Sequence, residues 1–200
     1  LRQGVTTIVG GHCGASLAPL LYGNLEAVRK WADIGRVNVD WHTLDEFLAV
    51  VRRLKIGVNF GTCIGHATIR RDLVGEEIRD LTQSELEIFI QVLRQALRDG
   101  GLGFSTGLGY SQEAQVPYSE LKQLVGITAR AGKVYATHLR NEKERILEAV
   151  SETVRIAQET GAKTMISHLR PLRGFETQFQ TALELIEKNL VNANIAMDVS

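Results

Sequence analysis

The sequence has few cysteines, no excess of either charge and no long apolar run. Its 23 basic and 23 acidic residues balance, which gives no indication of a nucleic acid or an anionic membrane as a partner. No stretch approaches the roughly 18 consecutive apolar residues that a membrane-spanning helix needs. The two cysteines, Cys13 and Cys63, are too few for a disulfide scaffold and suit a reducing cytoplasm. We therefore expect a cytoplasmic protein without a nucleic-acid or membrane partner.

An initiating methionine, a signal peptide, a linker and an internal repeat are also absent. The chain begins Leu1-Arg2-Gln3-Gly4-Val5, which predicts a fragment or a processed product. Without linkers or repeats we expect residues 1–200 to be part of one domain, with no second domain. No G-x-G-x-x-G motif opens a helix directly after a strand, which argues against a dinucleotide-binding fold. Ser105 is not in a G-x-S-x-G turn, so nothing supports a serine hydrolase.

Six short apolar runs alternate with helical segments along the chain. The expected strands are 5–9, 56–60, 102–106, 133–138, 163–168 and 193–199. The expected helices are 24–31, 43–54, 86–99, 120–131, 142–160 and 177–189, and two of them open with the capping boxes Thr43–Glu46 and Thr82–Glu85. This alternation predicts an α/β fold with a parallel sheet and right-handed crossovers. Periodicity leaves open whether the sheet is part of an eight-stranded barrel or an open doubly wound sheet.

Two histidines, thirty residues apart, each close one of these runs. His138 ends the run 133–138, and His168 ends the run 163–168. The carboxyl ends of neighbouring parallel strands lie at one edge of a sheet, where ligands and catalytic groups collect. We therefore expect the two imidazoles to share a metal ion. The alternative is a pair of structural histidines that are hydrogen-bonded at the strand ends without metal.

Cys13 is the third candidate ligand. It follows the run 5–9 and belongs to the turn Gly10-Gly11-His12-Cys13-Gly14, whose glycines let the backbone come close to a ligand. Zinc accepts thiolate sulfur and imidazole nitrogen, and a catalytic zinc site keeps one position open for water. A Cys-His-His set plus water is therefore typical of hydrolysis. The alternative for Cys13 is a buried, inert side chain.

Further polar residues near the strand ends are candidates for substrate contact. Tyr110 and Ser105 lie at or just beyond the end of a strand, and Arg140 and Arg170 each follow a candidate histidine by two residues. A guanidinium there would hold a substrate carboxylate with two hydrogen bonds. The alternatives are solvated surface charges for the arginines and a hydroxyl bonded to backbone for Ser105.

Cys63 and His66 form a Cys-x-x-His pair in the loop expected after the strand 56–60. A zinc knuckle needs two more ligands nearby, and the sequence offers none. We therefore expect His66 to line the mouth of the active site rather than to bind a structural zinc ion.

Four segments, in order, resemble the N-acyl-D-amino-acid deacylases (D-aminoacylases). They are residues 4–19, with Cys13; 103–110, Gly-Phe-Ser-Thr-Gly-Leu-Gly-Tyr; 135–142, with His138; and 166–169, with His168. The similarity extends over nearly all 200 residues. This family belongs to the amidohydrolase superfamily, whose catalytic domain is a metal-dependent (β/α)8 TIM barrel. The resemblance implies that the chain is a partial TIM barrel, about strands 2 to 7.

The resemblance also implies roles for individual residues. Cys13, His138 and His168 would hold one Zn²⁺ ion tightly, with a second, weaker site left open for the full-length enzyme, and Tyr110 would approach the substrate. A His-x-His pair on the first barrel strand and a catalytic aspartate on the eighth are expected outside this chain, so that no catalytic residue lies within it. Arg170 stands where the family commonly has lysine, which leaves the side-chain preference open.

The activity implied is hydrolysis of the amide bond of an N-acyl-D-amino acid, a small-molecule substrate, to a carboxylate and a D-amino acid. These 200 residues taken alone are expected to be inactive. Two alternatives stay open: a related amidohydrolase acting on another linear or cyclic amide or a dipeptide, and a non-catalytic barrel relative that serves as a binding protein. The oligomeric state is not indicated.

Overall fold

The computed structural model describes residues 2–23, 25, 28, 29, 33, 35 and 38–199. Within them, six parallel strands form one sheet in the order β1-β2-β3-β4-β5-β6. The strands are Thr7–Gly10 (β1), Asn59–Gly65 (β2), Gly103–Gly107 (β3), Val134–His138 (β4), Lys163–Ile166 (β5) and Ile195–Met197 (β6).

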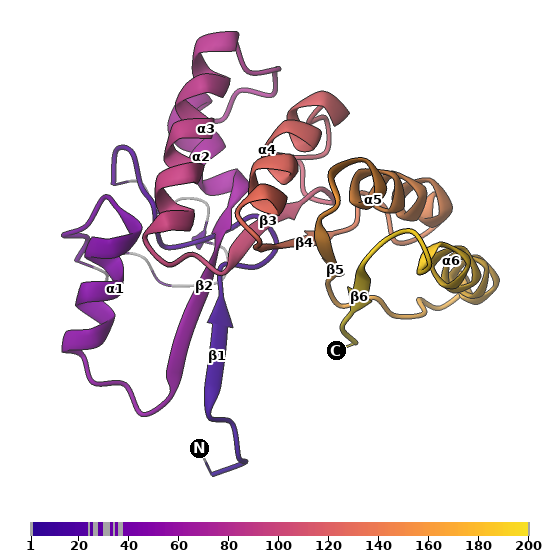
Figure 1. Ribbon diagram of the computed structural model, residues 1–200, viewed down its shortest axis with the longest axis horizontal. Coiled ribbons are helices and arrows are strands. Elements are labelled where there is room, and N and C mark those ends of the chain that lie inside the picture. Colours follow the sequence, from indigo (N-terminus) through magenta and orange to yellow (C-terminus); the bar gives the residue numbers. More distant parts are fainter. Residues whose placement is uncertain are drawn as a thin grey trace.

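Helices surround the strands on the outside. They are Leu44–Arg53 (α1), His66–Val74 (α2), Gln83–Arg98 (α3), Tyr118–Arg130 (α4), Ile146–Thr160 (α5) and Glu176–Asn189 (α6). Figure 1 shows them as an outer arc that runs from α1 over α3 and α4 to α6, around the fan of strands. The strand order follows the chain without the reversal that a doubly wound sheet has at its switch point. The sheet is therefore part of a barrel, and the expected partial TIM barrel is confirmed.

The starts of the helices show where local signals were sufficient. Thr43 and Thr82 form the expected capping boxes of α1 and α3. By contrast, α4 begins after Pro117 without a side-chain cap, and α5 begins at Ile146, four residues later than expected. Before α5, the Asn141 side chain accepts the backbone N–H groups two and four residues on and holds a turn instead of a first helical turn.

The prediction of a loop directly after residue 60 is wrong. Strand β2 continues to Gly65, with Cys63 and Ile64 buried, and the helix α2, which was not predicted, begins directly at His66. Two glycines in Gly61-Thr62-Cys63-Ile64-Gly65 are typical of a turn. Pairing of this segment with β3, in which Cys63 lies opposite Gly103, overrides that local preference.

The main core lies between the helices α1–α4 and the sheet. Phe89, Phe104 and Tyr135 form a row of rings with centroids 6.2 and 6.1 Å apart, and all three are at most 1% exposed. Burial of each such side chain stabilises the fold by about 1.5–3 kcal/mol. A second apolar cluster joins α5, α6 and β5. Together they fix the edge at which the strand ends, and hence the candidate ligands, meet.

The expected helix 24–31 lies largely outside the described residues. Across the part of the chain that the structure describes, every helix is too short or too polar to cross a bilayer. Cys13 and Cys63 are both free thiols.

Candidate metal centre

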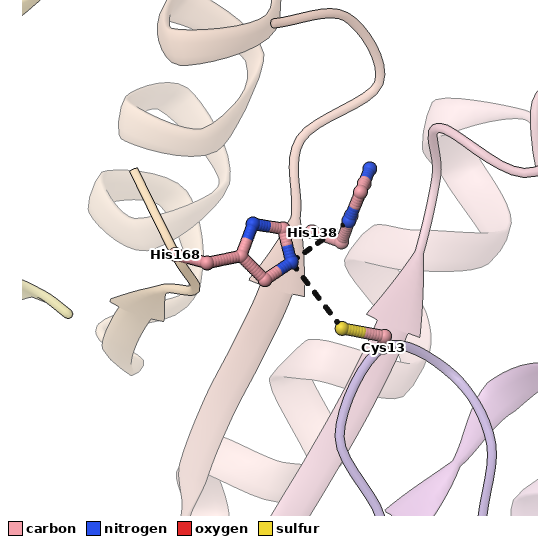
Figure 2. Close-up of side chains that lie close together, drawn as sticks. All are labelled: Cys13, His138 and His168. Carbon is pink, nitrogen blue, oxygen red and sulfur yellow. Dashed lines mark hydrogen bonds between the residues drawn. The ribbon is translucent and has the colours of Figure 1, made fainter. Parts of the chain in front are cut away.

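Three side chains from three distant segments meet at the carboxyl edge of the sheet. Figure 2 shows Cys13, from the turn after β1, beside His138 at the end of β4 and His168 in the turn after β5. The Cys13 Sγ lies 3.4 Å from His168 Nε2, and His138 Nδ1 lies 2.9 Å from the same nitrogen. The sequence prediction that these three side chains are neighbours therefore agrees with the geometry.

The turn that carries Cys13 is attached to the neighbouring strand β3. The Ser105 hydroxyl, on β3, donates a hydrogen bond to the Gly11 carbonyl at 2.5 Å and accepts one from the Gly14 N–H at 3.2 Å. Because Ser105 is fully buried, its hydroxyl is unavailable to a substrate. The expectation that Ser105 faces substrate is thus corrected in favour of its alternative, a hydroxyl bonded to backbone.

Two of the three candidate ligands have an unusual backbone conformation. Cys13 has φ of 52° and His168 has φ of 43°, in the left-handed region that costs a non-glycine residue on the order of 1–3 kcal/mol. Such strain persists only where the surrounding structure imposes it, and it concentrates at functional sites. The His168 turn is held by Asp198, whose backbone carbonyl accepts the Leu169 N–H at 2.9 Å. Both strained residues thus direct their side chains toward one point.

Glu142 faces the outer side of both imidazoles. Its carboxylate oxygens lie 3.3 Å from His168 Nδ1 and 3.9 Å from His138 Nε2. An acceptor on the distal nitrogen of a histidine fixes the tautomer in which the other nitrogen carries a lone pair, as in carboxylate–histidine–zinc triads. This contact of Glu142 was not predicted from the sequence, although the residue lies only four positions after His138.

The donor set fits a zinc ion. The Sγ of Cys13 and the facing nitrogens of His138 and His168 lie within 4.8 Å of one another, a spacing that one ion with bonds of about 2.0–2.3 Å can span. Burial first, and then the negative charge of Glu113, raises the pKa of the Cys13 thiol. A bound cation reverses this effect, because a metal-coordinated thiol is deprotonated.

Tyr110 lies against the candidate metal centre. Its ring centroid is 4.7 Å from that of His138. The approach depends on Gly109, because a Cβ at this position would lie 2.5 Å from His138 Nε2. Tyr110 also lines a cavity of about 530 Å³ together with Cys13 and His168. Other residues that line this cavity include His12, Leu17, Phe47 and Phe60.

The guanidinium of Arg140 donates its hydrogen bonds within the protein. Its guanidinium donates twice to the Glu152 carboxylate, at 3.0 Å each, and to the backbone carbonyls of Glu113, Ala114 and Val116. These contacts use all five N–H donors of the side chain. The expectation that Arg140 holds a substrate carboxylate is therefore corrected: this arginine ties the segment after Tyr110 to α5. Arg170 is exposed and lies two residues after His168.

His66 does not line the mouth of the site. Its side chain is fully buried at the start of α2, and both ring nitrogens bond carboxylates, Nδ1 to Glu113 at 2.7 Å and Nε2 to Glu120 at 2.8 Å. The expectation is corrected because β2 extends through Gly65 and carries His66 under α4 instead of into a loop. No local pattern in the sequence pairs His66 with glutamates 47 and 54 residues away.

Known proteins resemble this chain from end to end. It is 32% identical over 200 residues to the D-aminoacylase of Alcaligenes xylosoxydans xylosoxydans, an alignment that covers 99% of this chain and 41% of that protein. No family model matches the chain.

Solved structures share the fold. One is a structure of D-aminoacylase that concerns the functional role of its binuclear metal centre, with one-metal activation and second-metal attenuation. Its TM-score is 0.88, and its sequence is 30% identical. Another is the N-acyl-D-glutamate deacylase of Bordetella bronchiseptica with zinc and a phosphonate inhibitor, at a TM-score of 0.88 and 28% identity. Each match covers 98% of this chain and 42% of the solved chain. The chain thus spans about two fifths of the length of these relatives.

Proposed function

We propose that this chain supplies the zinc-binding part of an N-acyl-D-amino-acid deacylase. It is a homologue of these enzymes (D-aminoacylases), which belong to the amidohydrolase superfamily. The proposed reaction is hydrolysis of the amide bond of an N-acyl-D-amino acid to a carboxylate and a D-amino acid. One observation carries the proposal: a thiol and two imidazoles from three separate segments converge within 4.8 Å, with a carboxylate facing both imidazoles.

The residues of this chain have distinct roles in the proposed reaction. Cys13, His138 and His168 would hold the ion, and Glu142, 3.3 Å from His168 Nδ1, would keep the lone pair of the His168 Nε2 directed at it. Bound zinc supplies Lewis acidity, which polarises an amide carbonyl and makes water nucleophilic near neutral pH. The proton transfer to the leaving amine is assigned to the aspartate that the resemblance places on the eighth barrel strand, outside residues 1–200.

Two side chains remain candidates for substrate contact. Tyr110 lies beside His138 and lines the cavity next to Cys13, where a phenol can donate a hydrogen bond to a polar substrate group. Arg170 follows His168 at the same edge and is exposed, so that its guanidinium can bind a substrate carboxylate. Both assignments predict an effect on KM.

The cellular setting belongs to the same proposal. Two free thiols, one of them in the candidate metal centre, suit a reducing cytoplasm. Residues 1–200 are proposed as part of the catalytic barrel domain, without a second domain inside the chain. A second, weaker metal site would need ligands from outside this chain, because Cys13, His138 and His168 are the one group of three metal-ligating side chains that the described residues bring together.

The test is the metal content of the protein, expressed as its gene encodes it, by elemental analysis. We expect near-stoichiometric zinc in the parent and its loss in Cys13→Ser and His138→Ala. Two matched variants, Cys63→Ser and His42→Ala, change the same residue types away from the site and should keep the metal. Cys63 is buried in β2, and His42 contacts the Leu20 carbonyl near the surface.

Activity then separates the proposal from its alternatives. Zinc with hydrolysis of N-acetyl-D-amino acids supports the deacylase. Zinc with hydrolysis only of cyclic amides or dipeptides favours a related amidohydrolase. A folded parent without metal contradicts the proposal and favours the non-catalytic binding protein.

A further inference from the structure

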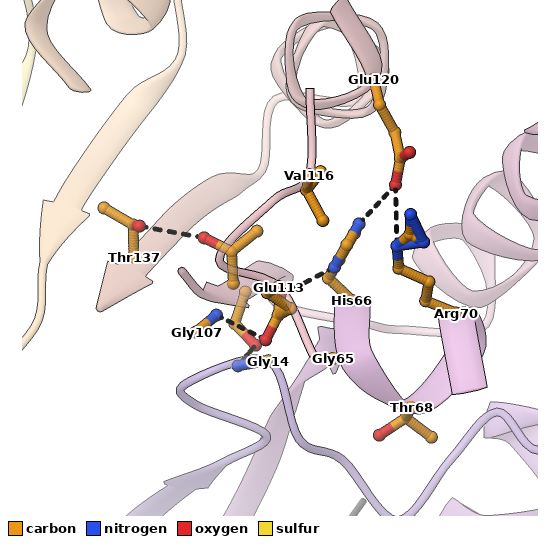
Figure 3. A network of polar contacts seen from close by, with 12 residues as sticks. Gly14, Gly65, His66, Thr68, Arg70, Gly107, Glu113, Val116, Glu120 and Thr137 are labelled. Carbon is orange, nitrogen blue, oxygen red and sulfur yellow. Dashed lines mark hydrogen bonds and ion pairs between the residues drawn. The ribbon is translucent and has the colours of Figure 1, made fainter. Parts of the chain in front are cut away.

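A buried group of charged side chains lies beneath the candidate metal centre, without belonging to it. We name it the His66 cluster; Figure 3 shows its members His66, Arg70, Glu113 and Glu120. His66 Nδ1 lies 2.7 Å from Glu113 Oε1, and His66 Nε2 lies 2.8 Å from Glu120 Oε1. The Arg70 Nε is 3.7 Å from the same Glu120 oxygen. The four side chains are at most 7% exposed.

The two short contacts favour the protonated form of His66. A neutral imidazole has one N–H donor, whereas an imidazolium has two. Both nitrogens of His66 face carboxylates, which accept hydrogen bonds when ionised. Burial lowers the pKa of His66, but its hydrogen bonds to Glu113 and Glu120 outweigh burial, and the pKa is raised. With His66 charged, two cations face two anions, and the cluster is balanced within the apolar core.

The second oxygen of Glu113 connects this cluster to the metal-binding edge. It accepts the Gly107 N–H at 2.9 Å and lies directly against Gly14. Three groups lie directly against Gly107: a Cβ there would clash with the Cys13 carbonyl, the Tyr110 ring and the Glu113 carboxylate. The Glu113 carboxylate therefore packs between the turn that carries Cys13 and the turn that carries Tyr110.

We propose that His66 and Glu113 are positioning residues for the candidate metal centre: His66 fixes the rotamer of Glu113, and Glu113 fixes the Cys13 and Tyr110 turns against each other. The proposal rests on the metal-binding function proposed above. Glu120 lies on the far side of His66 and contacts neither turn through the hydrogen bonds of the described residues. If the His66 cluster only stabilised the core, substitution of either glutamate would have the same effect on the metal centre. If the cluster positions the two turns, substitution of Glu113 has the larger effect.

The experiment uses two variants and two matched controls in the protein as its gene encodes it. Glu113→Asp keeps the charge but withdraws the carboxylate from Gly107, and Glu120→Asp makes the same change on the other side of the ring. His66→Gln removes the imidazole that contacts both Glu113 and Glu120. Phe89→Leu disturbs the same part of the core, since the Phe89 ring lies 5.3 Å from that of His66. Zinc affinity is measured by competition with a chelator, and unfolding by the midpoint temperature.

A second readout does not need metal: the rate at which Cys13 of the zinc-free protein reacts with a thiol reagent, in a Cys63→Ser background. The electrostatic effect of His66→Gln has the opposite sign to a loosened turn. Loss of a positive charge next to Glu113 disfavours the Cys13 thiolate and slows the reaction, whereas a loosened turn exposes the thiol and speeds it.

We expect Glu113→Asp and His66→Gln to weaken zinc binding about 10–100-fold, the range for residues that support metal ligands, and to speed the thiol reaction several-fold. Glu120→Asp and Phe89→Leu should leave both quantities near the parent values while lowering the midpoint temperature. Unchanged zinc affinity and thiol rate in the first two variants would overturn the proposal. If the parent binds no zinc, the proposed function fails, and the thiol rate alone decides whether the positioning holds.

Discussion

The molecule contains histidines in two contrasting environments. His66 is fully buried, and both of its nitrogens are bonded to carboxylates. His138 and His168 have side chains that are 13% and 27% exposed, and each turns one nitrogen toward Glu142 and the other toward the remaining candidate ligands. Both environments combine imidazoles with carboxylates, and they differ in what lies on the second nitrogen.

This difference distinguishes a structural histidine from a candidate ligand. Where carboxylates occupy both nitrogens, the imidazolium is balanced by the protein itself and no lone pair is left for a metal. Where a carboxylate occupies only one nitrogen, the other keeps its lone pair. The thiol of Cys13 adds a third donor at the same point. A zinc ion in the proposed site would complete the second arrangement, whereas the first offers it no lone pair.

The largest effect on stability is expected for His66→Ala. Truncation leaves Glu113 and Glu120 buried without their shared cation, and breaking a buried pair in this way costs about 3–5 kcal/mol of unfolding free energy. Denaturant unfolding measures it. The exposed His42→Ala should stay within about 0.5 kcal/mol of the parent. Equal losses in the two variants would show that the buried contacts of His66 with the two glutamates do not stabilise the fold.

Glu142→Gln tests the other environment. The amide keeps the size of the side chain but loses the charge that faces His138 and His168, so zinc affinity should fall about 10–100-fold. The unfolding midpoint of the zinc-free protein should hardly change. Glu144→Gln, at an exposed position nearby, is the control for chelator competition. Zinc binding that is as tight in Glu142→Gln as in the parent would show that the carboxylate does not orient the ligands.

Arg140→Lys extends the comparison to a cation that the protein satisfies internally. Lysine cannot reproduce the planar set of five donors, so unfolding free energy should fall by about 1–3 kcal/mol. KM for an N-acyl-D-amino acid should stay unchanged, whereas Arg170→Lys should change KM with little effect on stability. Exposed Arg94→Lys controls for the substitution itself. A raised KM in Arg140→Lys would restore the substrate-binding role.

The smallest effect concerns pH. The pKa of His66 is raised in the folded protein, because the hydrogen bonds of Glu113 and Glu120 outweigh burial. Protonation therefore contributes stability that is fully present below the unfolded pKa of about 6.5 and is lost as pH rises through the folded pKa. Arg70 lies next to Glu120, and the rings of Phe89 and Phe104 pack against His66. The stability gap between parent and His66→Gln should shrink as pH rises; a gap that widens would contradict the assignment.

Local patterns in the sequence were sufficient for the elements that local physics controls. The capping boxes at Thr43 and Thr82 place the starts of α1 and α3. Strand periodicity together with terminal histidines correctly predicts that His138 and His168 lie at one edge, because neighbouring parallel strands end together. The helix α2 and the late start of α5 were not predicted, since sheet pairing and a side-chain turn override local propensity there.

An α/β chain of alternating strands and helices and a candidate Cys-His-His donor set could be predicted from the residues alone. Which polar residues serve that donor set depends on contacts that form only in the folded chain. His66, Ser105 and Arg140 have no sequence signal that separates a substrate contact from an internal brace. Their partners are Glu113 and Glu120 for His66, the Cys13 turn for Ser105, and α5 for Arg140. Hydrogen-bond satisfaction is a property of neighbours in space, and closing the sheet into part of a barrel is what selects those neighbours.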